Sequence, residues 1–126
     1  MRVRAEVAVK ATESVEKVRR ALLNLFPDAE VAEEPGRLVA RTTSLERLRE
    51  ILREQRIRDT ARGQMISGLE GNVLAFTLSK QAAFVGRASF AAGSPLGDIE
   101  VAVEDADLDA VIDWVAESTV GKRLKR

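Results

Sequence analysis

The stretch RVRAEVAVK, residues 2–10, alternates between two kinds of side chain. Val3, Ala5, Val7 and Val9 fall on one side of an extended chain, and the charged residues fall on the other. A period of two predicts a β-strand with one buried face. DIEVAVE, residues 98–104, alternates in the same way, and VLAFTL, residues 73–78, is typical of a buried strand. The fold is therefore expected to rest on a sheet.

Helical spacing of apolar residues separates these strands. Thr12 is a plausible N-cap for a helix that Pro27 ends near residue 26. The sequence TSLE, residues 43–46, has the pattern of a capping box, and two helical patterns follow it up to about residue 67. Residues 29–42 read as two short strands around a Pro-Gly turn, and a last helix begins near Leu108. This order predicts an α+β, two-layer fold with a mainly antiparallel sheet.

The 126 residues suit a single domain, 1–126, with a frayed basic tail at 119–126. The sequence contains neither cysteine nor histidine, so disulfides, thiolate chemistry and the usual imidazole acid–base group are excluded. Walker A, dinucleotide-binding and zinc-ligand patterns are absent as well. No signal peptide and no membrane-spanning run is recognisable, which favours a cytoplasmic protein without a membrane partner.

Charge is segregated along a chain whose net charge is zero. Residues 41–90 carry nine basic and five acidic residues, whereas residues 91–117 carry eight acids and no base. Such segregation can build a basic face on a neutral protein, although solvated faces can simply differ in sign. The candidate nucleic-acid-binding residues are Arg56, Arg58, Arg62, Lys80, Gln81 and Arg87. Lysine and arginine bind phosphates, and a glutamine amide can reach a base or a 2′-hydroxyl.

The acidic stretch 98–109 allows other chemistry. Its carboxylates could hold a hard cation or act as a catalytic pair, but an acidic solvated face or a helix cap explains them better. Only five aromatic residues are present, and Trp114, which neighbours the apolar stripe of the last helix, is expected to pack rather than to stack on a base. Few stacking platforms are then available for single-stranded RNA, so structured RNA is the more suitable partner.

Several motifs together resemble the archaeal uncharacterised protein family 0201. They are DTAR (59–62), GLEGN (68–72), KQAAFVG (80–86) and SPLG (94–97), within a resemblance that runs nearly end to end. Members of that family are described as predicted RNA-binding proteins and are sometimes linked to the exosome. The resemblance implies a fold similar to ribosomal protein L five, with a twisted antiparallel sheet and helices packed on one face. It also implies that KQAAFVG forms a structured connection, with Lys80, Gln81 and Arg87 at its rim. The alternative for two of these residues is that Lys80 caps a helix end or pairs with an acid and that Gln81 bonds to backbone.

We therefore predict a non-catalytic RNA-binding domain that contacts phosphate backbone and RNA shape through a basic face. We expect no cofactor and no metal. The alternative is a protein–protein interaction module, either a homodimer or an assembly subunit, without direct RNA contact. RNA-processing proteins are possible partners in both cases. A carboxylate-based enzyme is a third hypothesis, which would need a pocket that gathers the acids of 98–109.

Overall fold

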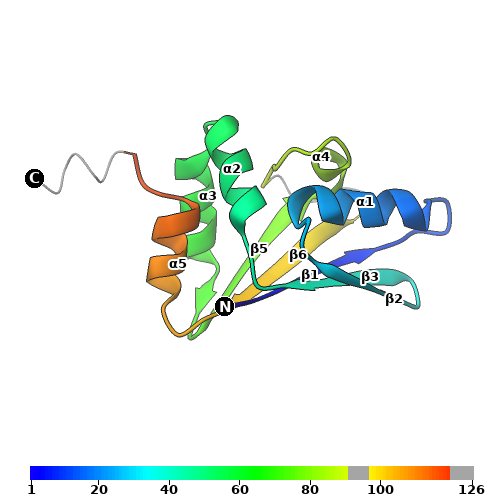
Figure 1. Ribbon diagram of the computed structural model, residues 1–126, viewed down its shortest axis with the longest axis horizontal. Helices are drawn as coiled ribbons and strands as arrows, with labels where there is room; N and C mark the ends of the chain where they lie inside the picture. Colours follow the sequence, from blue (N-terminus) through cyan, green and yellow to red (C-terminus); the bar gives the residue numbers. More distant parts are fainter. Residues whose placement is uncertain (91–96, 120–126) are drawn as a thin grey trace, which may run out of the picture.

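The structure, a computed structural model, describes residues 1–90 and 97–119 (Figure 1). Its strands are β1 (Arg2–Ala8), β2 (Glu30–Glu34), β3 (Arg37–Thr42), β4 (Leu69–Glu70), β5 (Val73–Ser79) and β6 (Asp98–Glu104). Its helices are α1 (Val15–Leu25), α2 (Glu46–Glu54), α3 (Arg58–Ser67), α4 (Lys80–Phe84) and α5 (Leu108–Val115). Within the described residues, no helix combines the length and the apolar character needed to cross a bilayer.

The strands form a twisted six-stranded sheet in the order β2-β3-β1-β6-β5-β4, and every pairing is antiparallel. The alternating segment that opens the chain becomes the inner strand β1, between β3 and β6. Val3, for example, lies opposite Thr42 on one side and Val103 on the other. The predicted α+β class with an antiparallel sheet is confirmed.

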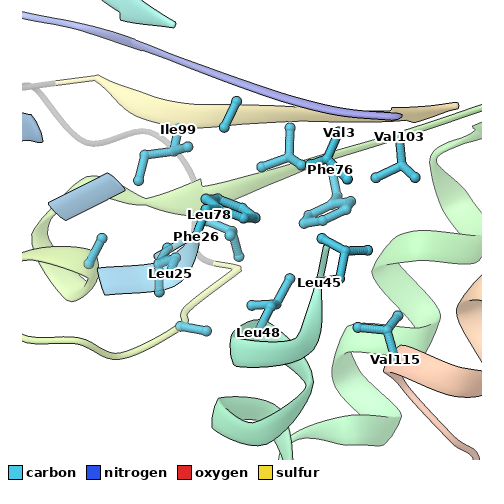
Figure 2. Close-up of a cluster of buried hydrophobic side chains, with 14 of the residues drawn as sticks. Val3, Leu25, Phe26, Leu45, Leu48, Phe76, Leu78, Ile99, Val103 and Val115 are labelled. Carbon is cyan, nitrogen blue, oxygen red and sulfur yellow. The ribbon is translucent and has the colours of Figure 1, made fainter. Parts of the chain in front are cut away.

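The helices cover one face of this sheet and leave the other open. In Figure 1 helices α1 to α4 lie above the sheet, and α5 lies at one end against α2 and α3. Figure 2 shows Val3, Phe76 and Ile99 from the sheet pointing toward Leu48, Leu25 and other residues of the helical layer. These side chains are buried, so the apolar side of each alternating strand forms the core. The two-layer prediction, with helices on one face, is confirmed.

Two predicted helix starts are wrong by a few residues. Helix α1 is capped by Ser14, whose Oγ accepts a hydrogen bond from the N–H of Lys17 at 3.3 Å, rather than by Thr12. Helix α2 begins at Glu46, and the Ser44 hydroxyl accepts from the N–H of Glu46 at 3.2 Å. The predicted Thr43 capping box does not form, because the N-cap position falls on Leu45, two residues later than that pattern requires.

The KQAAFVG segment is a single helical turn that closes the connection after β5. Ser79 caps α4 by accepting from the N–H of Ala82 at 3.2 Å, and Gly86 ends the turn with a φ of 73°. Such a positive φ is readily available to glycine. The expectation of a structured connection is confirmed. Residues 94–96 of the SPLG motif and residues 120–126 of the predicted tail lie outside the described residues.

Candidate nucleic-acid interface

The predicted binding residues do not form one cluster. Arg58 and Arg62 are one turn apart on α3, and both are half-buried. The Arg62 guanidinium lies 2.7 Å from Asp113 and donates to the carbonyl of Ala116 at 3.3 Å. These two contacts fasten α3 to α5. An RNA phosphate would therefore have to compete with Asp113 for the Arg62 side chain.

Lys80 is fully buried, so the prediction that it lies at the rim of the connection is wrong. Its Nζ donates to the carbonyl oxygen of Ala8 at 2.8 Å and to Oε1 of Glu13 at 2.9 Å. Burial acts to raise the pKa of Glu13, but the N–H of Lys10 and the charge of Lys80 outweigh it, and the pKa lies below its usual range. Lys80 thus ties α4 to the end of β1, where RNA cannot reach it.

A pair of hydrogen bonds joins the end of α2 to the segment after α4. The Gln55 side-chain amide donates to the carbonyl of Ala88, and its oxygen accepts from the N–H of Ala88, both at 2.8 Å. We call this contact the Gln55–Ala88 junction. Arg56 and Arg87 are each one residue away, so the junction places both cations in the same region of the surface. Both are exposed, and neither has an ion-pair partner within the part of the chain that the structure describes.

The positions of Gln81 and Arg56 determine which groups this surface offers to a ligand. Gln81 is exposed on α4, which packs against α1. Arg56 adopts a φ of 59°, a left-handed backbone conformation that is uncommon for a residue with a side chain. That conformation reverses the chain between α2 and α3. It leaves Arg56 at an exposed corner beside the junction.

The aromatic side chains offer little stacking surface. Phe76 and Phe90 pack against each other with ring centroids 6.1 Å apart, and Phe26 is in the core. Trp114 is partly exposed, but the Arg49 guanidinium lies 5.0 Å from its ring centroid and covers it. Trp114 was expected to pack, but its side chain is 41% exposed and its ring contacts Arg49. A surface of this kind suits contacts with phosphates better than stacking with unpaired bases.

The open face of the sheet carries a second set of cations, which the sequence did not single out. Arg4 of β1 lies directly opposite Arg41 of β3, and both side chains leave the sheet on the open face. Arg4 pairs with Glu6 at 2.9 Å, and Glu6 also pairs with Arg37. Burial acts to raise the pKa of Glu6, but the two arginines outweigh it and the pKa lies below its usual range. Arg41 has no ion-pair partner among residues 1–90 and 97–119.

These arginines border a hollow of about 650 Å³ on the open face. Arg2, Arg4 and Arg41 line it together with the hydroxyl residues Thr43 and Ser44, and we call it the arginine hollow. The alternation of residues 2–10 already placed Arg2 and Arg4 on the polar side of a strand. Their approach to Arg41 depends on strand register, for which the sequence carried no visible signal.

The acids of 98–109 lie in two groups. Asp98, Glu100 and Glu104 share the open side of β6, as the alternation predicted. Asp107 caps α5 by accepting from the N–H of Ala110 at 3.0 Å, and Asp105 accepts from the N–H of Asp107 at 2.9 Å. The prediction of a helix cap is confirmed. In the described ranges, no group of three or more acidic residues is arranged to hold a metal ion.

Comparison with known proteins identifies the family to which this chain belongs. The model of a family described as RNA binding matches residues 2–104. A UPF0201 protein of Sulfurisphaera tokodaii is 42% identical over 124 residues, which cover 90% of this chain and 86% of the relative. A UPF0201 protein of Methanothermobacter thermautotrophicus is 40% identical over 119 residues, covering 91% and 90% of the two chains. The protein therefore belongs to the UPF0201 family.

A solved structure agrees with this assignment. The crystal structure of the UPF0201 protein from Methanococcus jannaschii is similar to this fold with a TM-score of 0.89. The two chains are 36% identical, and the match covers 94% of this chain and 95% of the other. The predicted family membership is thus confirmed by sequence and by fold.

Proposed function

We propose that this protein is a non-catalytic RNA-binding domain that acts in the cytoplasm. The observation that carries the proposal is the match of residues 2–104 to a family described as RNA binding. Similarity of this extent concerns the whole fold, so it supports RNA as the partner and leaves the contact surface to be argued from geometry. RNA-processing proteins, including those of the exosome, are the partners that we expect to share the RNA.

The surface that we assign to RNA surrounds the Gln55–Ala88 junction. Arg56 and Arg87 are exposed there, and no described carboxylate competes for their guanidinium groups. Gln81 contributes a hydrogen-bonding amide on the exposed side of α4. Arginine binds phosphate oxygens with charge-assisted and often bidentate hydrogen bonds. Of the six residues predicted from the sequence, these three fit the proposal best.

The expected ligand is structured RNA. Trp114 is the one exposed aromatic side chain among the described residues, and the Arg49 guanidinium lies over its ring, so a row of aromatic platforms for successive bases is not present there. Contacts made by arginine and glutamine side chains reach the phosphate backbone and 2′-hydroxyls, which a folded RNA displays in a fixed arrangement. Binding should therefore depend on RNA shape more than on base sequence.

Fluorescence anisotropy tests this proposal with a dumbbell RNA that has no free ends and with a single strand of equal length. Each is titrated at low and at physiological salt. We expect the dumbbell to bind more tightly, and its affinity to fall with salt because phosphate contacts release counterions. Arg87→Glu and Arg56→Glu should each weaken binding and lower the salt slope by about 0.9 per lost contact.

Arg41→Glu is the matched control, because Arg41 is an exposed arginine on the opposite face of the sheet. It should leave binding of the dumbbell unchanged. The assigned surface would be wrong if Arg41→Glu lost binding, or if Arg56→Glu and Arg87→Glu both kept full affinity for the dumbbell RNA. Absence of salt-dependent binding to either RNA by the unaltered protein would contradict the proposed function itself.

One observation favours protein–protein association as a second function. Strand β2 is an edge of the sheet, and its five residues expose an unpaired row of backbone groups. A second copy could pair with that edge and form a homodimer. Its acidic side chains, Glu30, Glu33 and Glu34, oppose such pairing by repulsion at neutral pH. Sedimentation equilibrium tests this, and a monomer at the highest soluble concentration would argue against it.

A further inference from the structure

The arginine hollow is a feature of the open face that the proposed RNA surface does not use. It lies over the ends of β1 and β3, on the side of the sheet that the helices leave uncovered. Its volume of about 650 Å³ is within the range of pockets that bind small molecules, which is about 300–1,000 Å³. Its floor includes the small side chain of Ala102, the partner of Arg4 on β6. A small floor residue leaves room above the sheet.

Arg4 and Arg41 lie side by side on the sheet, and their electrostatic repulsion is unfavourable for folding. Arg4 and Arg41 are direct partners on neighbouring antiparallel strands, and like charges in that position repel each other. Glu6 forms an ion pair with Arg4, but it also forms one with Arg37, so one carboxylate is shared between two arginines. Glu30 is the register partner of Arg41 on β2, yet no ion pair joins them within the described chain. The repulsion would be relieved by an anion bound between Arg4 and Arg41.

The other residues that line the hollow determine which kind of anion can bind there. Arg2, Arg4 and Arg41 provide guanidinium groups, and Thr43 and Ser44 provide hydroxyl groups, so a phosphate can receive several hydrogen bonds there. Acidic residues also line the hollow: Asp28, Glu30 and Glu104. These carboxylates would repel any further negative charge placed directly against them, such as a second carboxylate of an acidic peptide. They would accept hydrogen bonds from hydroxyl and amino groups at the uncharged end of a ligand.

We infer that the arginine hollow binds a ribonucleotide phosphate. The phosphate lies between Arg4 and Arg41. The guanidinium of Arg2 lies 3.4 Å from the carboxylate of Glu104, and it can also donate to the phosphate when that ion pair opens. Ribose hydroxyls and base amino groups face the carboxylates of the lining. This site is on the opposite face from the Gln55–Ala88 junction, and its existence does not depend on the proposed RNA surface. The nucleotide is either free in solution or the phosphorylated end of an RNA chain.

Isothermal titration calorimetry with the four ribonucleoside 5′-monophosphates tests the inference, with adenosine and inorganic phosphate as comparisons. We expect at least one monophosphate to bind, and adenosine and phosphate each to bind at least tenfold more weakly. Arg41→Gln should reduce monophosphate binding at least tenfold. Arg20→Gln, at an exposed position of α1 on the helical side of the sheet, should not change it.

Thermal unfolding of Arg41→Gln separates binding from folding. Removal of a charge that repels Arg4 should leave the Tm unchanged or raise it. A marked fall in Tm would mean that Arg41 serves the fold, and it would overturn the inference. So would the absence of binding by all four monophosphates at millimolar concentration, equal binding by phosphate alone, or full binding by Arg41→Gln.

A 5′-phosphorylated RNA trinucleotide distinguishes the two sources of the ligand. Tighter binding by the trinucleotide than by the monophosphates identifies the site as a receptor for RNA ends. Equal or weaker binding identifies it as a site for free nucleotides. Both results support a ribonucleotide site. The dumbbell RNA used to test the proposed function has no ends, so failure of one proposal does not imply failure of the other.

Discussion

Lys80 and Glu13 form an ion pair that links positions 67 residues apart in the chain. The Nζ of Lys80 lies 2.9 Å from Oε1 of Glu13, and the Lys80 side chain is completely shielded from solvent. Oε1 of Glu13 also accepts from the N–H of Lys10, so the carboxylate is held by two donors. The pair joins the loop before α1 to the first residue of α4. It therefore fixes the start of the KQAAFVG turn against the end of β1.

Removal of one partner of this pair should destabilise the fold strongly. Lys80→Met leaves the Glu13 carboxylate shielded from water without its cation, which typically costs about 3–5 kcal/mol. Urea unfolding followed by circular dichroism measures the change in the free energy of unfolding.

The double variant Lys80→Met, Glu13→Gln is the matched control. It removes both charges, and replacement of a buried ion pair by uncharged groups is often close to neutral. It should recover most of the stability that the single change loses. If Lys80→Met loses less than about 1 kcal/mol, or if the double variant is no better, the pair does not stabilise the fold in the way that its geometry indicates.

The same pair makes stability depend on acid. The pKa of Glu13 in the folded protein lies below its ordinary value of 4.5, because Lys10 and Lys80 outweigh the effect of burial. The unfolded chain then binds a proton more readily than the folded one. The contribution of Glu13 is fully present above pH 4.5 and is lost as the pH falls through the folded pKa.

Thermal unfolding between about pH 6 and about pH 3 checks this dependence. Glu6, Asp59 and Asp105 also have lowered pKa values, so all variants should lose stability in acid. The unaltered protein should lose more than the double variant, which cannot titrate at position 13. Parallel pH profiles for the two proteins would contradict the assignment of this effect to Glu13.

Local patterns explain how much of the fold could be predicted. The alternation of residues 2–10 and 98–104 depends only on which side chains avoid water, and both segments form strands. Helix spacing likewise identified α1, α2 and α5. Lys80 was placed wrongly because its partners, Ala8 and Glu13, are far away in sequence, and nothing near Lys80 indicates its burial. The likeness to ribosomal protein L five stays a prediction.

The candidate site was predicted only in part, for a related reason. Arg56 and Arg87 were both identified as cations, but their proximity results from hydrogen bonds between residues 33 positions apart. The approach of Arg4 to Arg41 results from the register of β1 and β3. A change of register by one residue would move every side chain of a strand to the other face. Sequence periodicity identifies the face of a side chain but not its neighbour across the strands.

Gln55 is expected to support both stability and RNA binding. Gln55→Ala removes both hydrogen bonds to the buried Ala88 backbone, and an unsatisfied buried group costs about 1–3 kcal/mol. Gln55→Glu keeps the shape but cannot donate to the Ala88 carbonyl, so it should also destabilise the junction. Urea unfolding measures the loss of stability, and anisotropy with the dumbbell RNA measures the loss of RNA binding.

Gln64 provides the matched control for Gln55. It is exposed on α3, and Gln64→Ala should change the free energy of unfolding by less than about 0.5 kcal/mol. RNA affinity should fall for Gln55→Ala and not for Gln64→Ala, because only the first change releases the segment that carries Arg87. Unchanged RNA affinity in a folded Gln55→Ala protein would separate the junction from the proposed interface.

Two glycines near the third helix should respond to the same substitution in opposite ways. A Cβ on Gly68 would lie 1.7 Å from the carbonyl oxygen of Ala75, whose N–H donates to the Gly68 carbonyl at 3.0 Å. The backbone of β5 would have to move, so Gly68→Ala should destabilise by about 1–3 kcal/mol or more. A methyl group on Gly63, inside α3, would instead extend into open space. Gly63→Ala should stabilise by about 0.5–1 kcal/mol, because alanine favours the helix. Urea unfolding of both variants measures the contrast, and a Gly68→Ala protein as stable as Gly63→Ala would show that α3 and β5 do not approach each other this closely.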